Sequence, residues 1–149
     1  MSMNRILPAV LCLIFALVPA AQADLKAALA ERDLGKRSKL ALDNAAETLK
    51  AARAALQAGE NEKIAAAVAE MKESVDLAYD SLKSTGKDPR KSPKWFKHAE
   101  IATRDLLKKL DTLQQDMNFQ DRSVLSELKT RVQQVHDELL VGLMEGTKK

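Results

Sequence analysis

Four apolar stripes with helical spacing constrain the fold of this chain more than any other feature. Within each stripe the residues recur every three or four positions, which is the period of one face of an α-helix. The stripes are Leu42, Ala45, Leu49, Ala52 and Leu56; Ile64, Val68, Met71, Val75, Ala78 and Leu82; Phe96, Ala99, Thr103, Leu106, Leu110, Leu113 and Met117; and Leu125, Leu128, Val132, Val135 and Leu139. Because each stripe has to be shielded from water, the pattern predicts an all-α protein whose helices pack as in a coiled coil around one core.

Glycine and proline predict where the helices end. Pro89 and Pro93 are the only prolines in the helical part of the chain, and the sequence on both sides of them is rich in helix-forming alanine, leucine, lysine and glutamate. Gly59 and Gly86 suit left-handed caps at helix C-termini. Because the links near Gly59 and at 118–121 are short, we predict an antiparallel, up-down-up-down four-helix bundle.

Polar residues that can cap a helix predict where the helices begin. Asn61 can start the second helix, and Asp121 can cap the last one. Ser92 is placed to cap the third helix, with Pro93 at the first helical position, where its missing N–H costs nothing. Gly146 would end the last helix.

The first stretch, residues 25–58, is too long for its predicted partners. As one straight helix its 34 residues would reach about 51 Å. Either this overlong first helix projects beyond the bundle, or it breaks near Leu34 and Gly35, where glycine costs roughly 1 kcal/mol relative to alanine. A projecting helix would expose apolar residues such as Leu29 and would favour self-association through 24–39.

The N-terminal segment has the organisation of a secretory signal peptide. Arg5 precedes an apolar run over 6–18, and small residues flank the glutamine in 21–23. The run is shorter than the roughly 20 apolar residues needed to cross a bilayer. We predict a signal peptide at 1–23, cleaved at its end, and one bundle domain at 24–149 that has no transmembrane span and is periplasmic or secreted.

Neither the charge nor the cysteine content of the predicted mature chain points to a particular partner. The whole chain has 24 basic and 21 acidic residues, so loss of Arg5 with the signal peptide leaves 23 basic against 21 acidic. This near balance gives no support to nucleic-acid binding, and any basic surface has to be local. The one cysteine, Cys12, would leave with the signal peptide, so no disulfide is expected.

Basic residues and an aromatic pair are concentrated between residues 87 and 98. The candidate contacts are Lys87, Arg90, Lys91, Lys94, Trp95 and Lys97. Lysines beside a tryptophan are typical of sites that bind the phosphate groups of a membrane surface or another polyanion. The structural alternative is that Lys87 stabilises the end of the preceding helix, and that Trp95 and Phe96 close the end of the bundle.

His136 lies beside the last apolar stripe and gives the chain a resemblance to the soluble periplasmic b-type cytochromes. The shared features are an Asp-Leu-Lys start after the signal peptide, two hairpins and a Ser-Pro link at 92–93. The resemblance implies, as an alternative function, a haem or small-ligand carrier with His136 as ligand. The methionine that this family supplies from its first helix has no counterpart, because Met71, Met117 and Met144 lie later, and Cys-x-x-Cys-His is absent. We therefore predict no cofactor.

The segment 91–146 resembles a group of short secreted bacterial helical proteins of unassigned function. The similarity rests on Ser-Pro-Lys-Trp-Phe-Lys at 92–97 and on Gln-Gln-Val-His-Asp-Glu-Leu-Leu at 133–140. It implies a secreted all-helical protein and no particular activity.

The sequence indicates neither a metal site nor a catalytic centre. The Glu-x-x-His motif of carboxylate-bridged metal sites is missing, since Gln133 and Trp95 stand three residues before His136 and His98. Glycine-rich loops that bind phosphate or present a nucleophile are absent as well. We therefore predict that the protein is no enzyme, but an exported module that binds an unknown macromolecule or an anionic envelope surface.

Overall fold

The described part of the protein, residues 22–146 of a computed structural model, consists of helices and their connections. The elements are α1 (Gln22–Ala30), α2 (Leu34–Gln57), α3 (Asn61–Ser84), α4 (Lys94–Asp116), the 3₁₀ segment η1 (Phe119–Leu125) and α5 (Ser126–Glu145). No strand occurs in this range, which confirms the all-α prediction. The predicted signal peptide, residues 1–23, falls outside the described residues except for the first two residues of α1.

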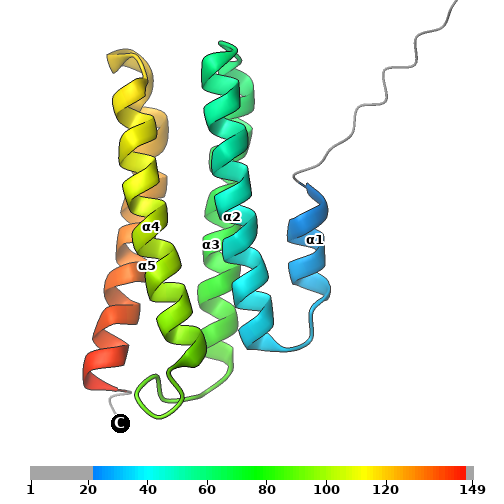
Figure 1. The fold of residues 1–149 in the computed structure, drawn as a ribbon, viewed down its shortest axis with the longest axis vertical. Coiled ribbons are helices and arrows are strands. Elements are labelled where there is room, and N and C mark those ends of the chain that lie inside the picture. The colour runs from blue at the N-terminus through cyan, green and yellow to red at the C-terminus, as the bar shows by residue number, and fades with distance from the viewer. Residues whose placement is uncertain (1–21, 147–149) are drawn as a thin grey trace, which may run out of the picture.

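The helices α2, α3, α4 and α5 form a bundle, and the short helix α1 lies beside α2 (Figure 1). The turn after α2 and the segment η1 are at one end of the bundle. The connections 31–33 and 85–93 are at the other end, together with the C-terminal end of α5 (Figure 1). We refer to this second end as the basal end.

The interior of the bundle is made by the four predicted stripes. Every stripe residue is buried except Leu56 and Val68, which are half-buried and pack against the core. Thr103 is fully buried and satisfies its hydroxyl by donating to the carbonyl of Ala99 at 2.8 Å. The predicted core is therefore confirmed, since the 3.6-residue period alone decides which side chains share a face.

Small side chains bring α2 and α3 together, and these two helices make the most extensive helix–helix contact of the described residues. The buried small residues are Ala41, Ala45, Ala52 and Ala55 of α2 and Ala67, Ser74, Ala78 and Ser81 of α3. Asn44 links the two helices by donating to Ser74 Oγ at 2.9 Å and to Glu70 Oε1 at 3.1 Å. Because alanine and serine barely protrude, the two backbones can approach closely.

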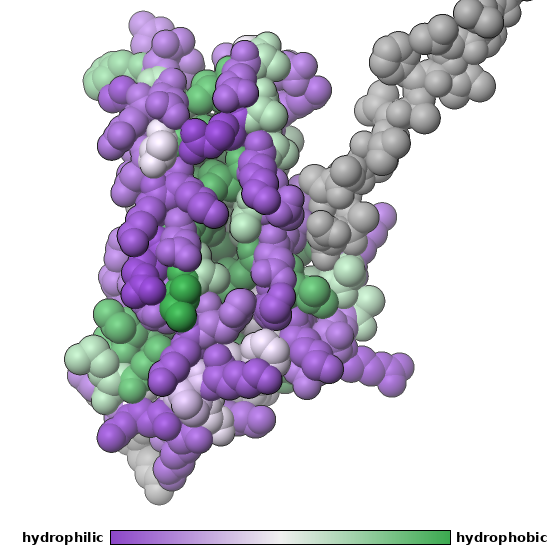
Figure 2. Space-filling view, in the orientation of Figure 1, coloured by the Kyte–Doolittle hydropathy of each residue, from purple (hydrophilic) through white to green (hydrophobic). Residues whose placement is uncertain are grey.

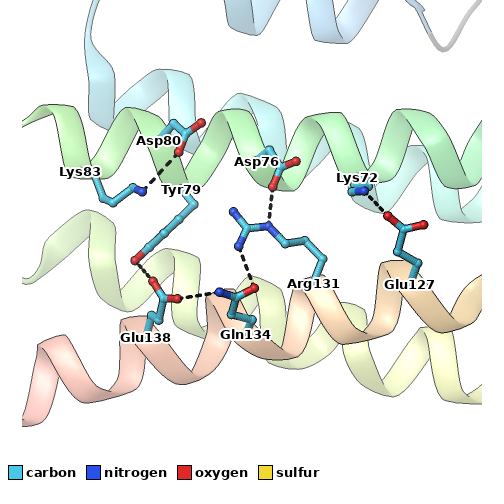
Figure 3. A network of polar contacts seen from close by, with 9 residues as sticks. All are labelled: Lys72, Asp76, Tyr79, Asp80, Lys83, Glu127, Arg131, Gln134 and Glu138. Carbon is cyan, nitrogen blue, oxygen red and sulfur yellow. Dashed lines mark hydrogen bonds and ion pairs between the residues drawn. The ribbon is translucent and has the colours of Figure 1, made fainter.

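Polar contacts join the outer edges of α3 and α5. Figure 3 shows three cross-links along this edge: Lys72 with Glu127, Asp76 with Arg131, and Tyr79 with Glu138. Arg131 Nε lies 2.6 Å from Asp76 Oδ1, and its Nη1 also donates to Gln134 Oε1 at 3.1 Å. Most of these side chains are partly exposed, so they set the register of the two helices more than they add stability.

The first stretch does not form one overlong helix, and that part of the prediction is wrong. It breaks at 31–33, and α1 folds back along α2 with Ala28 fully buried. Asp33 caps α2 by accepting from the backbone N–H of Lys36 at 2.9 Å, and Arg37 Nε donates to the carbonyl of Glu31 at 2.8 Å. The predicted alternative of a break is thus confirmed, although Gly35 lies inside α2 and does not cause it.

Three glycines end helices as predicted, whereas two of the predicted caps are wrong. Gly59, Gly86 and Gly146 have φ angles of +72°, +64° and +76°, the left-handed region that only glycine adopts freely. Ser92 makes no capping bond because Pro93 already has helical dihedral angles as the N-cap residue of α4. Asp121 does not cap α5, since η1 intervenes and α5 begins at residue 126.

Within residues 22–146, none of the helices combines the length and the apolar character required to traverse a bilayer.

Candidate functional site

The basic residues singled out from the sequence lie at the basal end, and all five are exposed. Lys87, Arg90 and Lys91 belong to the connection between α3 and α4, while Lys94 and Lys97 are in the first turn of α4. Figure 2 shows mainly hydrophilic residues at this end of the visible face. The structure thus brings the predicted basic cluster together on one end of the bundle.

The connection 85–93 has a defined conformation at its start. The Thr85 hydroxyl donates to the carbonyl of Leu82 at 2.7 Å and accepts from the backbone N–H of Lys87 at 3.2 Å. Gly86, between them, takes the left-handed conformation that reverses the chain. These bonds fix the backbone from which the Lys87 side chain extends.

The middle of the connection is docked on the end of α5. A Cβ added to Gly142 would lie 3.2 Å from Pro89 Cγ, and one added to Gly146 would lie 3.0 Å from Arg90 Cδ. Asp88, the one acidic residue between 87 and 98, accepts from the backbone N–H of Arg90 at 2.9 Å. Its carboxylate therefore orders the turn.

Trp95 packs against the start of α2. A Cβ on Gly35 would lie only 2.2 Å from indole atoms Cδ1 and Nε1, so the indole occupies the space that any other residue would fill. The ammonium group of Lys94 lies 4.6 Å from the centre of the indole ring, and the His98 ring meets it edge-on at 6.4 Å. The glycine at position 35 is thus a packing requirement of the tryptophan.

These contacts surround an open hollow of about 430 Å³, which we call the basal hollow. It is lined by Asp33, Leu34, Gly35, Leu82, Thr85, Lys87, Ser92, Pro93, Lys94, Trp95 and Phe96. The half-buried residues Leu34, Pro93 and Trp95 provide apolar surface, Leu82 and Phe96 lie behind it in the core, and two lysines provide positive charge. The hollow is therefore open and mixed in character, with charged, hydroxyl-bearing and apolar side chains side by side.

The basal hollow divides the predicted contact residues into two groups. Lys87, Lys94 and Trp95 line it, whereas the other three basic candidates do not and remain on the outer surface of the basal end. Residues 33–35 were missed by the sequence reasoning. The available signal was Asp33 itself, a preferred N-cap residue that could mark the start of a helix.

One carboxylate lies on the rim of the basal hollow. The backbone N–H of Lys36 holds the pKa of Asp33 below its ordinary value of 3.8, with smaller contributions from the charges of Lys36 and Lys87. Asp33 is therefore charged at neutral pH and directed to the first turn of α2. The side-chain charges around the hollow are two positive and one negative.

His136, the ligand of the alternative haem hypothesis, lies between α4 and α5. Its Nδ1 atom is 3.3 Å from the Thr103 hydroxyl and 3.9 Å from Glu100 Oε1, and the side chain is largely buried. The methionine of the last helix, Met144, is exposed, and Met71 is sealed in the core of α3. This is the setting of a histidine held in a helix–helix interface, and no observation on the described residues favours a haem role.

The other predicted features can be placed as well. Between 22 and 146, no cluster of three or more histidine, aspartate and glutamate side chains is suited to hold a metal ion. The segment proposed for self-association does not project. Its α1 part borders a hollow of about 460 Å³ against α3, where Leu29 is 56% exposed beside Ala66 and Ala69.

Comparison with known proteins assigns no relative to this architecture. The chain matches no family model, and neither curated proteins nor solved structures show significant similarity to it.

Proposed function

We propose that this protein is an exported, noncatalytic helical bundle that binds an anionic surface of the cell envelope through its basal end. The observation that carries the proposal is the grouping of five exposed basic residues there, while the nearby Asp88 is engaged in the turn. Each lysine or arginine near an anionic membrane contributes about 1 kcal/mol of attraction.

Exposed apolar residues at the same end support a membrane surface as the partner. The final turns of α5 reach the basal end, where Val141 and Met144 are 48% and 69% exposed (Figure 1). Figure 2 shows this hydrophobic area at the lower left. Basic residues beside apolar ones are the combination by which peripheral proteins attach to the interface of a bilayer.

The export part of the proposal rests on the sequence, and the topology part rests on the connections between the long helices. A signal peptide at 1–23 would deliver the chain to the periplasm or the medium, where the cysteine-free remainder depends on its packed core. The tight left-handed turn at Gly59 and the short segment η1 support an antiparallel, up-down-up-down arrangement of the long helices. Mass spectrometry of the protein recovered from its host should give a chain beginning at Asp24.

Vesicle sedimentation tests the surface-binding proposal. Vesicles of phosphatidylglycerol should retain the protein, and vesicles of phosphatidylcholine should not, with retention decreasing as the salt concentration rises. Replacing Lys91, Lys94 and Lys97 together by glutamine should weaken binding roughly hundredfold, at about 1 kcal/mol for each charge.

A matched variant separates a local basic surface from net charge. Replacing the exposed residues Lys50, Lys63 and Lys108 by glutamine removes the same charge away from the basal end and should leave retention nearly unchanged. Equal retention on both kinds of vesicle, or equal losses in the two triple variants, would refute the proposal.

A further inference from the structure

We propose that the basal hollow binds one anionic phospholipid molecule, taking its phosphate and hydroxyl-bearing headgroup together with the first part of an acyl chain. This inference rests on the proposed function, because it assigns to the membrane-facing end a specific lipid site. It goes further in naming the residues that select the lipid.

The hollow has two kinds of lining that match the two parts of a phospholipid. Lys87 and Lys94 approach it from the connection after α3 and from the start of α4, where a phosphate would lie between two ammonium groups. Leu34, Pro93 and Trp95, which are half-buried, line it with apolar surface that can contact methylene groups. A free phosphate would use only the first lining, whereas a lipid uses both.

Both lysines are held close to the hollow. Lys94 places its ammonium group over the Trp95 ring at 4.6 Å, a cation–π geometry that restricts a long side chain. Lys87 extends from backbone that the Thr85 hydroxyl fixes. Less conformational entropy is therefore lost when an anion binds between them.

Trp95 provides an aromatic wall at the same place. The indole is half-buried and packs its Cδ1 and Nε1 edge against Gly35. An amphipathic indole ring is suited to the headgroup level of a bilayer, where tryptophan is enriched.

The carboxylate of Asp33 further limits which lipid headgroups fit the hollow. It stays charged on the rim, so it repels a second phosphate and can accept a hydrogen bond from a hydroxyl. A phosphodiester that carries glycerol hydroxyl groups satisfies the two lysines and Asp33 together. Phosphatidylglycerol has this chemistry.

Fluorescence of Trp95, the only tryptophan of the chain, reports directly on the hollow. The exported protein is titrated with dihexanoyl phosphatidylglycerol below its micelle concentration, and in parallel with dihexanoyl phosphatidylcholine and with glycerol phosphate. We expect a saturable change with the first ligand and at least about tenfold weaker responses with the other two, which lack net charge or acyl chains.

Two pairs of substitutions locate the site. Lys87→Gln with Lys94→Gln should weaken the response to phosphatidylglycerol by about tenfold or more. Lys91→Gln with Lys97→Gln removes the same charge outside the hollow, so it should weaken binding to vesicles and leave the short-chain titration unchanged. Asp33→Asn should reduce the preference for phosphatidylglycerol over dihexanoyl phosphatidic acid.

The outcomes distinguish this inference from the proposed function. Retention on anionic vesicles without a saturable fluorescence change would overturn the lipid site and leave the surface-binding function standing. Equal responses to the two short-chain lipids, or equal losses in the two double variants, would overturn it as well. Circular dichroism of each variant establishes that the comparison is made between folded proteins.

Discussion

The indole of Trp95 lies so close to the backbone of Gly35 that a methyl group at residue 35 would be 2.2 Å from two of its atoms. These residues are 60 positions apart in the sequence, and their contact joins the first turn of α2 to the first turn of α4. It is also one wall of the basal hollow.

Gly35→Ala should destabilise the protein even though alanine is the better helix former. Alanine gains about 1 kcal/mol of helix propensity, but the clash with Trp95 should outweigh it by about 1–3 kcal/mol. Urea unfolding followed by circular dichroism measures the change. Gly142→Ala is the matched control, because its Cβ would meet only the Pro89 ring, 3.2 Å from Cγ and 3.7 Å from Cβ, so the effect should be much smaller. A Gly35→Ala variant as stable as wild type would contradict this packing.

Asp33→Ala should loosen the break between α1 and α2, because the backbone N–H of Lys36 loses its acceptor. Asp33→Asn keeps a side chain that can cap the helix but removes the charge, so it isolates the electrostatic contribution of Asp33 to the stability of the protein. Since the folded-state pKa of Asp33 is lowered, its charge stabilises the fold above pH 3.8 and this contribution is lost as the pH falls through the folded-state value. Thermal unfolding should show that the advantage of wild type over Asp33→Asn is largest at neutral pH and decreases as the pH falls below 3.8 toward the folded-state pKa. An advantage that does not decrease in acid would contradict this assignment.

Ala52→Leu should destabilise the bundle by about 1–3 kcal/mol, because the fully buried alanine of α2 leaves no room for a larger side chain. Ala51→Leu, at the neighbouring exposed position, is the control and should change stability by less than about 0.5 kcal/mol. The midpoints of urea unfolding, at unchanged slope, give both values. Equal midpoints for the two variants would show that Ala52 is not tightly packed.

The single tyrosine allows the α3–α5 contact to be measured spectroscopically. Burial raises the pKa of Tyr79 above its ordinary value of 10.0, and the hydrogen bond to Glu138 and the charge of that carboxylate raise it further. Absorbance titration of tyrosinate should therefore give a lower pKa in Glu138→Gln than in wild type, with Glu127→Gln unchanged as the control on the same edge.

The same contact predicts how stability depends on alkaline pH. A phenol whose pKa is raised by folding stabilises the folded state fully below pH 10, and this contribution is lost as the pH rises through the folded-state value. Tyr79→Phe should remove this part of the pH dependence. If wild type and Tyr79→Phe lose stability in parallel between about pH 9 and 12, the contact is not formed in solution.

Features that depend on neighbouring residues could be predicted from the sequence. The buried stripes follow from the 3.6-residue period, and the helix ends at Gly59, Gly86 and Gly146 follow from the freedom of glycine to adopt positive φ. The grouping of basic residues at one end could be predicted too, because all five lie within residues 87–97, in one connection and the helical turn that follows it.

Features that depend on contacts between distant segments of the chain could not be predicted from the sequence. Residues 25–58 could form one continuous helix, or they could fold back and bury Ala28 against the bundle. The free energies of these two arrangements cannot be compared from the sequence alone. The basal hollow likewise needs residues 33–35, the end of α3 and the start of α4 at one place. Local periodicity determines which helix faces are apolar. Only the packed bundle determines which of these faces contact one another, because the free energy of each arrangement depends on contacts between residues that are far apart in the sequence.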